Sequence, residues 1–315
     1  MPENREIAEI NGGGYRALIN LSEGANCICL ENKALGVNIL RQPDYSAGID
    51  NPFLYGMPIL FPVNRISGGK FRFENMEYTF PINEPQTGCH LHGDLHTQPF
   101  AVTEKRSDGI SCRYFQAAER VGFPHSYTVE ISYSLSENGL EIKTDITNNS
   151  SLNMPVMLGF HTTFDIPFSK GSLPQNIRIS AEVGELTERN PETYLPTGRI
   201  ITDGRIGRLL NAGNFEPLSE KISLHYRAAG RGGIALTDTE SGIRITYKND
   251  PKFGWRLFYN GNADKFICLE PQTCMVDCKN SGLPDSRTGF DFVKPNGTKT
   301  YTSLISAEKV FLKNE

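Results

Sequence analysis

The sequence predicts an all-β fold with few and short helices. Residues of alternating hydrophobicity, the pattern of strands with one buried face, recur along the chain. Glycine and proline number 30 and 19 of 315 residues, which is about 16% of the chain against roughly 12% in average proteins. No segment of about 12 or more residues combines a 3.6-residue hydrophobic period with helix caps. Many short strands joined by turns therefore fit the chain better than a helix bundle.

The first predicted strands can be followed in chain order. Residues 15–20 and 25–30 form a candidate pair near the N-terminus. The clearest alternation covers residues 127–135 and 140–146. Between these two runs, Asn138-Gly139 can adopt the positive φ of a tight turn. The pattern predicts a β-hairpin with one buried face.

The C-terminal half shows the same organisation. Residues 222–226 alternate, and a second hairpin is predicted from residues 233–236 through a turn at 239–242 into 243–247. Residues 190–198 carry two prolines and a glycine without periodicity, and we interpret them as a long loop. No low-complexity linker or fixed-period repeat interrupts the chain. We therefore expect a single domain over residues 1–315.

Composition excludes several classes of function. The chain has 32 Lys and Arg against 36 Asp and Glu, a formal charge of −4, which argues against nucleic acid as a partner. The polar N-terminus lacks a secretory signal, and no run approaches the 18 or so apolar residues of a membrane span. We expect a cytoplasmic protein with no membrane partner; no feature indicates its oligomeric state. The seven cysteines include no C-x-x-C pair and are interpreted as reduced thiols.

Asn64 and Arg65 are the first candidate site residues. They follow an apolar, proline-containing run over residues 56–63. An arginine beside buried surface needs acceptors, which can be the oxygens of a ligand or a carboxylate at a strand end. This segment alone favours the carboxylate.

Histidines form the second candidate cluster. His90, His92 and His96 fall within seven residues, and an extended backbone would place the first two on one face. They could bind a metal or hydrogen-bond a substrate from a pocket wall. A cupin-type metal site would have a glutamate shortly after the H-x-H motif, but Asp94 is the only acidic residue before Glu104. A metal site is therefore the weaker interpretation.

Glu270 and His161 are the third candidate group. Glu270 follows an apolar strand-like run, and Pro271 favours extended backbone angles before it. A carboxylate at the end of a buried strand needs partners or a function. His161, taken alone, is more typical of a core histidine.

Together these segments resemble the aldose 1-epimerase, or galactose mutarotase, family. The motifs that carry the resemblance are Asn64-Arg65-Ile66, His90-Leu91-His92-Gly93, Gly159-Phe160-His161, Leu195-Pro196-Thr197-Gly198, Tyr259-Asn260-Gly261-Asn262 and Leu269-Glu270-Pro271-Gln272. Each is short, but their order and spacing over about residues 50 to 300 are specific. The resemblance implies a β-supersandwich of antiparallel sheets with a sugar site in a cleft.

The resemblance also implies residue roles. Glu270 would be the general base and His161 the general acid, while Asn64, Arg65 and His92 would position the sugar. The family uses no metal or organic cofactor. The residue types suit the chemistry, because with ordinary pKa values near 4.3 and 6.5 a glutamate accepts a proton at neutral pH and a histidine supplies one.

The chain departs from the family's motifs at four places. Asp94 and Thr163 replace a glycine and a tyrosine, Leu257 replaces a glutamine, and Leu218-Ser219-Glu220-Lys221 stands where the family has a sugar-binding aspartate. None of these changes affects the acid or the base. They leave the identity of the sugar undetermined.

Alternatives remain open at this stage. A hexose 6-phosphate epimerase of the same fold would need extra cations, for which Lys70, Arg72 and Arg256 are candidates. A non-catalytic carbohydrate-binding protein would use the same pocket without turnover. A glycoside hydrolase would need a second carboxylate, for which Asp165, Asp277 and Asp94 are candidates by residue type only.

Overall fold

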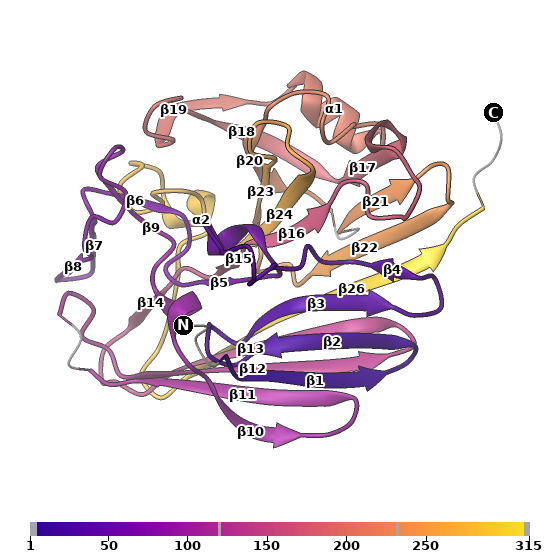
Figure 1. Ribbon diagram of the computed structural model, residues 1–315. Coiled ribbons are helices and arrows are strands. Elements are labelled where there is room, and N and C mark those ends of the chain that lie inside the picture. Colours follow the sequence, from indigo (N-terminus) through magenta and orange to yellow (C-terminus); the bar gives the residue numbers. More distant parts are fainter. Residues whose placement is uncertain (1–4, 119–120, 231–232, 312–315) are drawn as a thin grey trace.

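Antiparallel β-sheets make up most of the protein (Figure 1). The computed structural model describes residues 5–118, 121–230 and 233–311. Within them the strands form two eight-stranded sheets, one four-stranded sheet and three two-stranded pairs. Helices are few and short, as the sequence predicts: α1 (Arg205–Asn211), α2 (Asp285–Thr288), and the 3-10 turns η1 (Pro52–Leu54), η2 (Leu95–Thr97) and η3 (Pro174–Asn176).

One eight-stranded sheet, which we call the base, runs from β10 to β17. Its strand order is β10-β11-β12-β13-β26-β22-β21-β17. The bounds are β10 (Ala101–Lys105), β11 (Gly109–Gln116), β12 (Tyr127–Ser136), β13 (Gly139–Asn148), β26 (Thr298–Lys309), β22 (Ile243–Asn249), β21 (Ile234–Asp238) and β17 (Ile177–Ala181). Both predicted hairpins lie here, and the C-terminal strand β26 joins them at the centre of the sheet.

The second eight-stranded sheet carries the candidate site. Its order is β19-β18-β20-β23-β24-β15-β5, with β16 also paired to β24. The bounds are β19 (Pro196–Ile201), β18 (Val183–Arg189), β20 (Ser223–Ala228), β23 (Trp255–Tyr259), β24 (Phe266–Gln272), β15 (Gly159–Phe160), β5 (Ile59–Leu60) and β16 (Thr162–Asp165). The loop predicted over residues 190–198 is therefore too long, because its last residues belong to β19 and pair with β18.

The remaining strands form smaller sheets. The four-stranded sheet follows chain order as β1 (Ile7–Gly12), β2 (Tyr15–Asn20), β3 (Asn26–Asn32) and β4 (Val37–Asn38), which confirms the predicted N-terminal pair. The two-stranded pairs are β6 (Arg65–Ser67) with β9 (Cys89–Leu91), β7 (Lys70–Phe73) with β8 (Met76–Thr79), and β14 (Met154–Val156) with β25 (Asp291–Val293).

The sheets pack against one another through a shared hydrophobic core. The buried Tyr133 of β12 donates a hydrogen bond to the carbonyl of Ala25, which ties the four-stranded sheet to the base. Thr162 of β16 donates to the hydroxyl of Tyr247 on β22 at 3.1 Å, which links the site-bearing sheet to the base. The predicted antiparallel β-supersandwich is confirmed, and all seven cysteines are unpaired and buried.

Candidate active site

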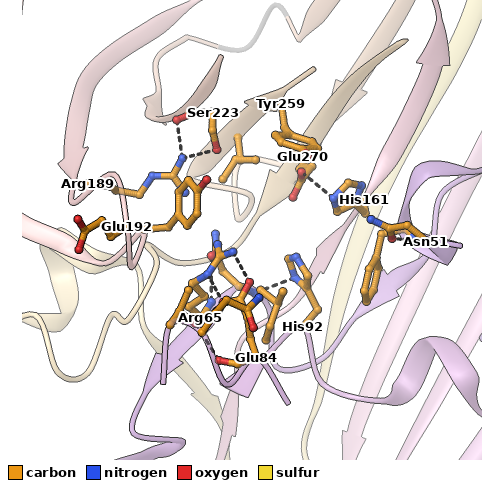
Figure 2. A pocket seen from close by; sticks show the side chains of 17 residues that line it. Asn51, Arg65, Glu84, His92, His161, Arg189, Glu192, Ser223, Tyr259 and Glu270 are labelled. Carbon is orange, nitrogen blue, oxygen red and sulfur yellow. Dashed lines mark hydrogen bonds and ion pairs between the residues drawn. The ribbon is translucent and has the colours of Figure 1, made fainter. Parts of the chain in front are cut away.

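A cavity of about 500 Å³ opens beside strand β24 (Figure 2). All five residues that the sequence singles out as a site line it: Asn64, Arg65, His92, His161 and Glu270. They come from four separate stretches of chain, so the fold brings together the motifs that the sequence shows only one at a time.

Glu270 lies within β24, a strand that continues through Pro271 to Gln272. The central position of β24 in its sheet leaves the side chain only 1% exposed. Gln272 is two residues further along and therefore projects from the same face. Its Nε2 donates to Oε2 of Glu270 at 3.1 Å, which fixes the direction of the carboxyl group.

His161 faces Glu270 directly. It follows β15, and its backbone N–H donates to the carbonyl of Pro58. Its Nε2 lies 3.1 Å from Oε1 of Glu270. A dashed line marks this contact in Figure 2. The ring of Phe53 lies 5.7 Å away, centre to centre. The pair is therefore close enough to share or exchange a proton.

Burial shifts both pKa values in this pair. Desolvation raises the pKa of Glu270 to about 8, although Gln272, Arg189 and Arg65 act in the opposite direction. Desolvation likewise lowers the pKa of His161 to about 3. The ordinary pKa values expected from the sequence are therefore wrong for this environment. Over the neutral range the pair therefore holds one titratable proton, which is on Glu270 because its pKa is the higher of the two.

Asn64 and His92 are joined to Glu270 by a chain of hydrogen bonds. The side chain of Asn64 donates to Oε1 of Gln272 at 3.0 Å. Its backbone N–H donates to Nδ1 of His92 at 3.2 Å. Burial lowers the pKa of His92 well below its usual value, so the ring is neutral and its proton is on Nε2. His92 can therefore donate to a ligand through Nε2.

The glycine after His92 has a steric role. Both residues have left-handed backbones, with φ of 62° at His92 and 65° at Gly93. A Cβ atom on Gly93 would lie 2.0 Å from the carbonyl oxygen of Phe61. The position therefore requires glycine. The close contact with Phe61 fixes the path of the backbone after β9, where His92 lies.

Arg65 is held by a carboxylate. Its Nε and Nη2 donate to the two carboxylate oxygens of Glu84, each at 2.6 Å. The guanidinium also lies over the ring of Tyr194, 4.6 Å from its centre. The sequence interpretation of a carboxylate partner is thus confirmed, while the side chain still lines the cavity.

The three clustered histidines diverge. His90 donates from Nδ1 to the carbonyl of Pro81 and stacks on Phe80. The ring of His96 lies 4.5 Å from that of Phe53, centre to centre, and His96 lines a second cavity. The expectation that His90 and His92 share one face is wrong, because β9 ends at Leu91 and the backbone of His92 is left-handed. Among the described residues, no group of three or more His, Cys, Asp or Glu side chains is placed to hold a metal.

Comparison with known proteins is consistent with this geometry. The aldose 1-epimerase family model matches residues 9–291. The chain belongs to the aldose 1-epimerase family. A galactose mutarotase-like protein from Clostridium acetobutylicum has a similar structure, with a TM-score of 0.91 and 28% identity over 98% of both chains.

More distant relatives are similar in structure or in sequence. A GalM/aldose epimerase homologue from C. elegans has a TM-score of 0.76 at 17% identity and covers 98% of this chain and 100% of its own. YihR of Escherichia coli K12, an uncharacterised protein, is 25% identical over 88% of this chain and 87% of its own.

In the described part of the chain, no helix has the length and apolar composition of a membrane span.

The departures from the aldose 1-epimerase motifs can now be placed. Leu257 lines the cavity where the family has a glutamine. Ser219 is not among the lining residues, and its hydroxyl donates to the carbonyl of Glu216. The neighbouring wall is instead formed by Arg189 and Ser223, two residues that the sequence analysis did not identify.

Other lining residues were also missed. Arg189 ends a strand, and Tyr194 lies in the segment interpreted as a loop, so neither carried a motif. Glu84 gave no local signal, because its partner Arg65 lies 19 residues earlier in the chain. Gln272 belongs to the motif Leu269-Glu270-Pro271-Gln272. Its separation of two residues from Glu270 was the signal that could have identified it as a neighbour of that side chain.

Proposed function

We propose that the protein is an aldose 1-epimerase that interconverts the α and β anomers of an aldose. The observation that carries the proposal is the 3.1 Å approach of His161 Nε2 to Glu270 Oε1 in the wall of the cavity. Mutarotation transfers protons at two oxygens that are bonded to the same carbon. Two proton-transferring groups that lie side by side match this requirement.

The reaction assigns one role to each member of the pair. Glu270 takes the proton of the C1 hydroxyl while Nε2 of His161 gives a proton to the ring oxygen. The bond between C1 and the ring oxygen breaks, and C1 becomes an aldehyde. Rotation about the C1–C2 bond and reclosure, with both protons returned, yield the other anomer. His92 and Arg65 would hold sugar hydroxyls and stabilise charge on oxygen.

The shared proton explains how buried groups can perform this chemistry. Each turnover requires one proton and one vacant site, and the pair supplies both between the pKa values of about 3 and about 8. In the empty pair this proton is on Glu270, and its transfer to His161 across the 3.1 Å contact forms the reactive state. The step then returns the proton from His161 to Glu270 through the sugar. Reclosure in the opposite direction restores the starting state, so no external acid or base is consumed.

The cavity gives less support to a glycoside hydrolase. That reaction needs two carboxyl groups at a defined separation of about 5 to 9.5 Å across the scissile bond. The three aspartates suggested by residue type, Asp94, Asp165 and Asp277, are absent from the lining. Among the lining carboxylates, Glu84 is bound to Arg65 and Glu192 is solvent-exposed.

The cations suggested for a hexose 6-phosphate epimerase are not placed to bind a phosphate in the cavity. Lys70 and Arg72 are exposed on the β7–β8 hairpin, and neither lines the cavity. The buried Arg256 donates to the carbonyls of Glu182 and Gly233. A hexose 6-phosphate epimerase would therefore need a different cation.

The first test measures how fast freshly dissolved α-D-glucose and α-D-galactose reach anomeric equilibrium, followed by polarimetry or NMR. We expect wild type to accelerate equilibration, and both Glu270→Gln and His161→Ala to reduce the rate at least about 100-fold. Glu137→Gln, at an exposed turn, is the matched control and should retain the wild-type rate. Sugar binding without acceleration by wild type would instead indicate the carbohydrate-binding alternative.

A further inference from the structure

Arg189 forms part of the cavity wall across from the catalytic pair. It is the last residue of β18, and its Nη2 donates both to the carbonyl and to the hydroxyl oxygen of Ser223, at 2.5 and 2.8 Å. Figure 2 shows Arg189 and His161 at opposite sides of the cavity. Arg189 is therefore held firmly in place, away from the groups that would act on C1.

One end of this guanidinium has no acceptor. Within the part of the chain that the structure describes, Nη1 of Arg189 is buried and lacks a hydrogen-bond partner. No described carboxylate lies within 4.0 Å of its nitrogens, in contrast to Arg65, whose charge Glu84 balances. A buried guanidinium nitrogen without an acceptor is costly. Because Arg189 lines the cavity, a small rotation of its guanidinium would let a ligand there supply that acceptor.

The guanidinium remains charged at neutral pH. Burial and the neighbouring Arg65 lower the pKa of Arg189 to about 10, while Glu270 and Tyr194 act in the opposite direction. The ring of Tyr194 lies under both guanidinium groups, 4.6 Å from Arg65 and 5.8 Å from Arg189. Arg189 is thus the cation of this wall that no protein carboxylate neutralises among the described residues.

We infer that the substrate is an aldose that carries a single negative charge on the side away from C1, and that Nη1 of Arg189 binds this acidic group. The inference rests on the proposed epimerase function. When C1 lies against Glu270 and His161, the opposite side of the sugar faces Arg189. Carboxylate, sulfate and sulfonate groups all provide the required monoanion.

The charge balance of the cavity favours one negative charge over two. Arg65 is already paired with Glu84, and Glu192 adds an exposed carboxylate to the same lining. Both hydrogens of Nη2 are used by Ser223, so Arg189 offers only Nη1 and not its two-nitrogen fork. A phosphate monoester carries nearly two charges at neutral pH and would be only half compensated.

Binding affinities test the inference independently of turnover. Titration calorimetry with D-glucose, D-glucuronate, D-glucose 6-sulfate and D-glucose 6-phosphate compares neutral, monoanionic and dianionic sugars of one ring. We expect wild type to bind at least one monoanionic sugar about tenfold or more tightly than glucose, and more tightly than the phosphate. The better of the two monoanions identifies the acidic group.

Variants assign that preference to Arg189. In Arg189→Met the affinity ratio of monoanionic to neutral sugar should fall to about one, whereas Arg189→Lys should keep part of it. Should the methionine variant fail to fold, the wild-type ratio and its decrease with added salt still decide the outcome. Equal wild-type binding of glucose and both monoanions, stronger binding of the phosphate, or an unchanged ratio in Arg189→Met would each overturn the inference.

Anomer exchange rates with the same sugars separate this inference from the proposed function. Monoanion-selective binding without accelerated exchange of any sugar would retain the role of Arg189 and reject the epimerase activity. Accelerated exchange of glucose without any preference for monoanions would retain the epimerase and reject the role of Arg189.

Discussion

The side chain of Asn64 donates a 3.0 Å hydrogen bond to Gln272, which lies 208 residues further along the chain. Gln272 in turn donates to Glu270. Both residues are buried, since Asn64 is 1% exposed and Gln272 is 0% exposed. The two amides therefore act as a rigid support that holds the carboxyl group of Glu270 towards His161.

Removing this support should impair catalysis more than binding. In Gln272→Ala, Glu270 loses its amide donor, and we expect kcat to fall about 10- to 100-fold with a smaller change in KM. Because Gln272 lowers the pKa of Glu270, the alkaline limb of the pH profile should move to higher pH. Gln175→Ala, at an exposed position, is the control. An unshifted alkaline limb would contradict this role.

Activity should depend on pH through the shared proton. Below a pH of about 3 both Glu270 and His161 are protonated and no base remains; above about 8 both have lost the proton and no acid remains. We therefore expect kcat/KM to be level from about pH 4 to 7 and to fall above 8. The measurement is anomer exchange by NMR after subtraction of the spontaneous rate. An acidic limb near 6.5 would show that His161 titrates as an exposed histidine.

Ionisation of the buried carboxyl group of Glu270 should also lower the free energy of unfolding at alkaline pH. Its pKa is raised from 4.5 to about 8, so the folded state holds the proton more tightly than the unfolded state. The stabilisation is fully present below pH 4.5 and is lost as the pH rises through 8.

Glu270→Gln removes this titration. As the pH rises from 4.5 to 8, the free energy of unfolding of this variant should increase by about 5 kcal/mol relative to that of wild type. Urea denaturation at several pH values measures the difference. A difference that does not change with pH would argue against burial of an ionisable group here.

The ion pair of Arg65 and Glu84 should contribute measurably to stability. The side chains are only 14% and 10% exposed, and Glu84→Gln leaves the guanidinium without its counter-charge. We expect a loss of about 1 to 2 kcal/mol in the free energy of unfolding. The control is Glu104→Gln in the pair with Arg106, where both side chains are more than half exposed and the change should be below about 0.5 kcal/mol.

Gly93 should tolerate no side chain. A Cβ atom would lie 2.0 Å from the Phe61 carbonyl oxygen, so Gly93→Ala must displace the backbone beside His92. We expect a loss of more than about 2 kcal/mol together with reduced activity. Gly88→Ala has nearly the same φ, +66°, but its Cβ would have no neighbour within 4 Å, and only the backbone strain of about 1 to 2 kcal/mol should remain. Equal losses in the two variants would contradict the steric argument.

Local patterns were sufficient to predict much of the fold. The hairpin of β12 and β13 follows from alternation and a turn sequence, both of which depend on residues close together in the chain. Strand β26 was not predicted, although Tyr301 and Ile305 are buried at the expected spacing. Its place between two hairpins from distant parts of the chain depends on packing that no local pattern specifies.

The candidate site divides in the same way. The sequence alone determined the strand-forming patterns, the family resemblance and five residues that line one cavity. Only the tertiary structure decided that His161 meets Glu270, that burial reverses their ordinary pKa order, and that Arg189 faces the cavity with an unmatched charge. The reason is physical: alternation records the neighbours of a residue in the chain, whereas desolvation and ion pairing depend on what distant segments place around it.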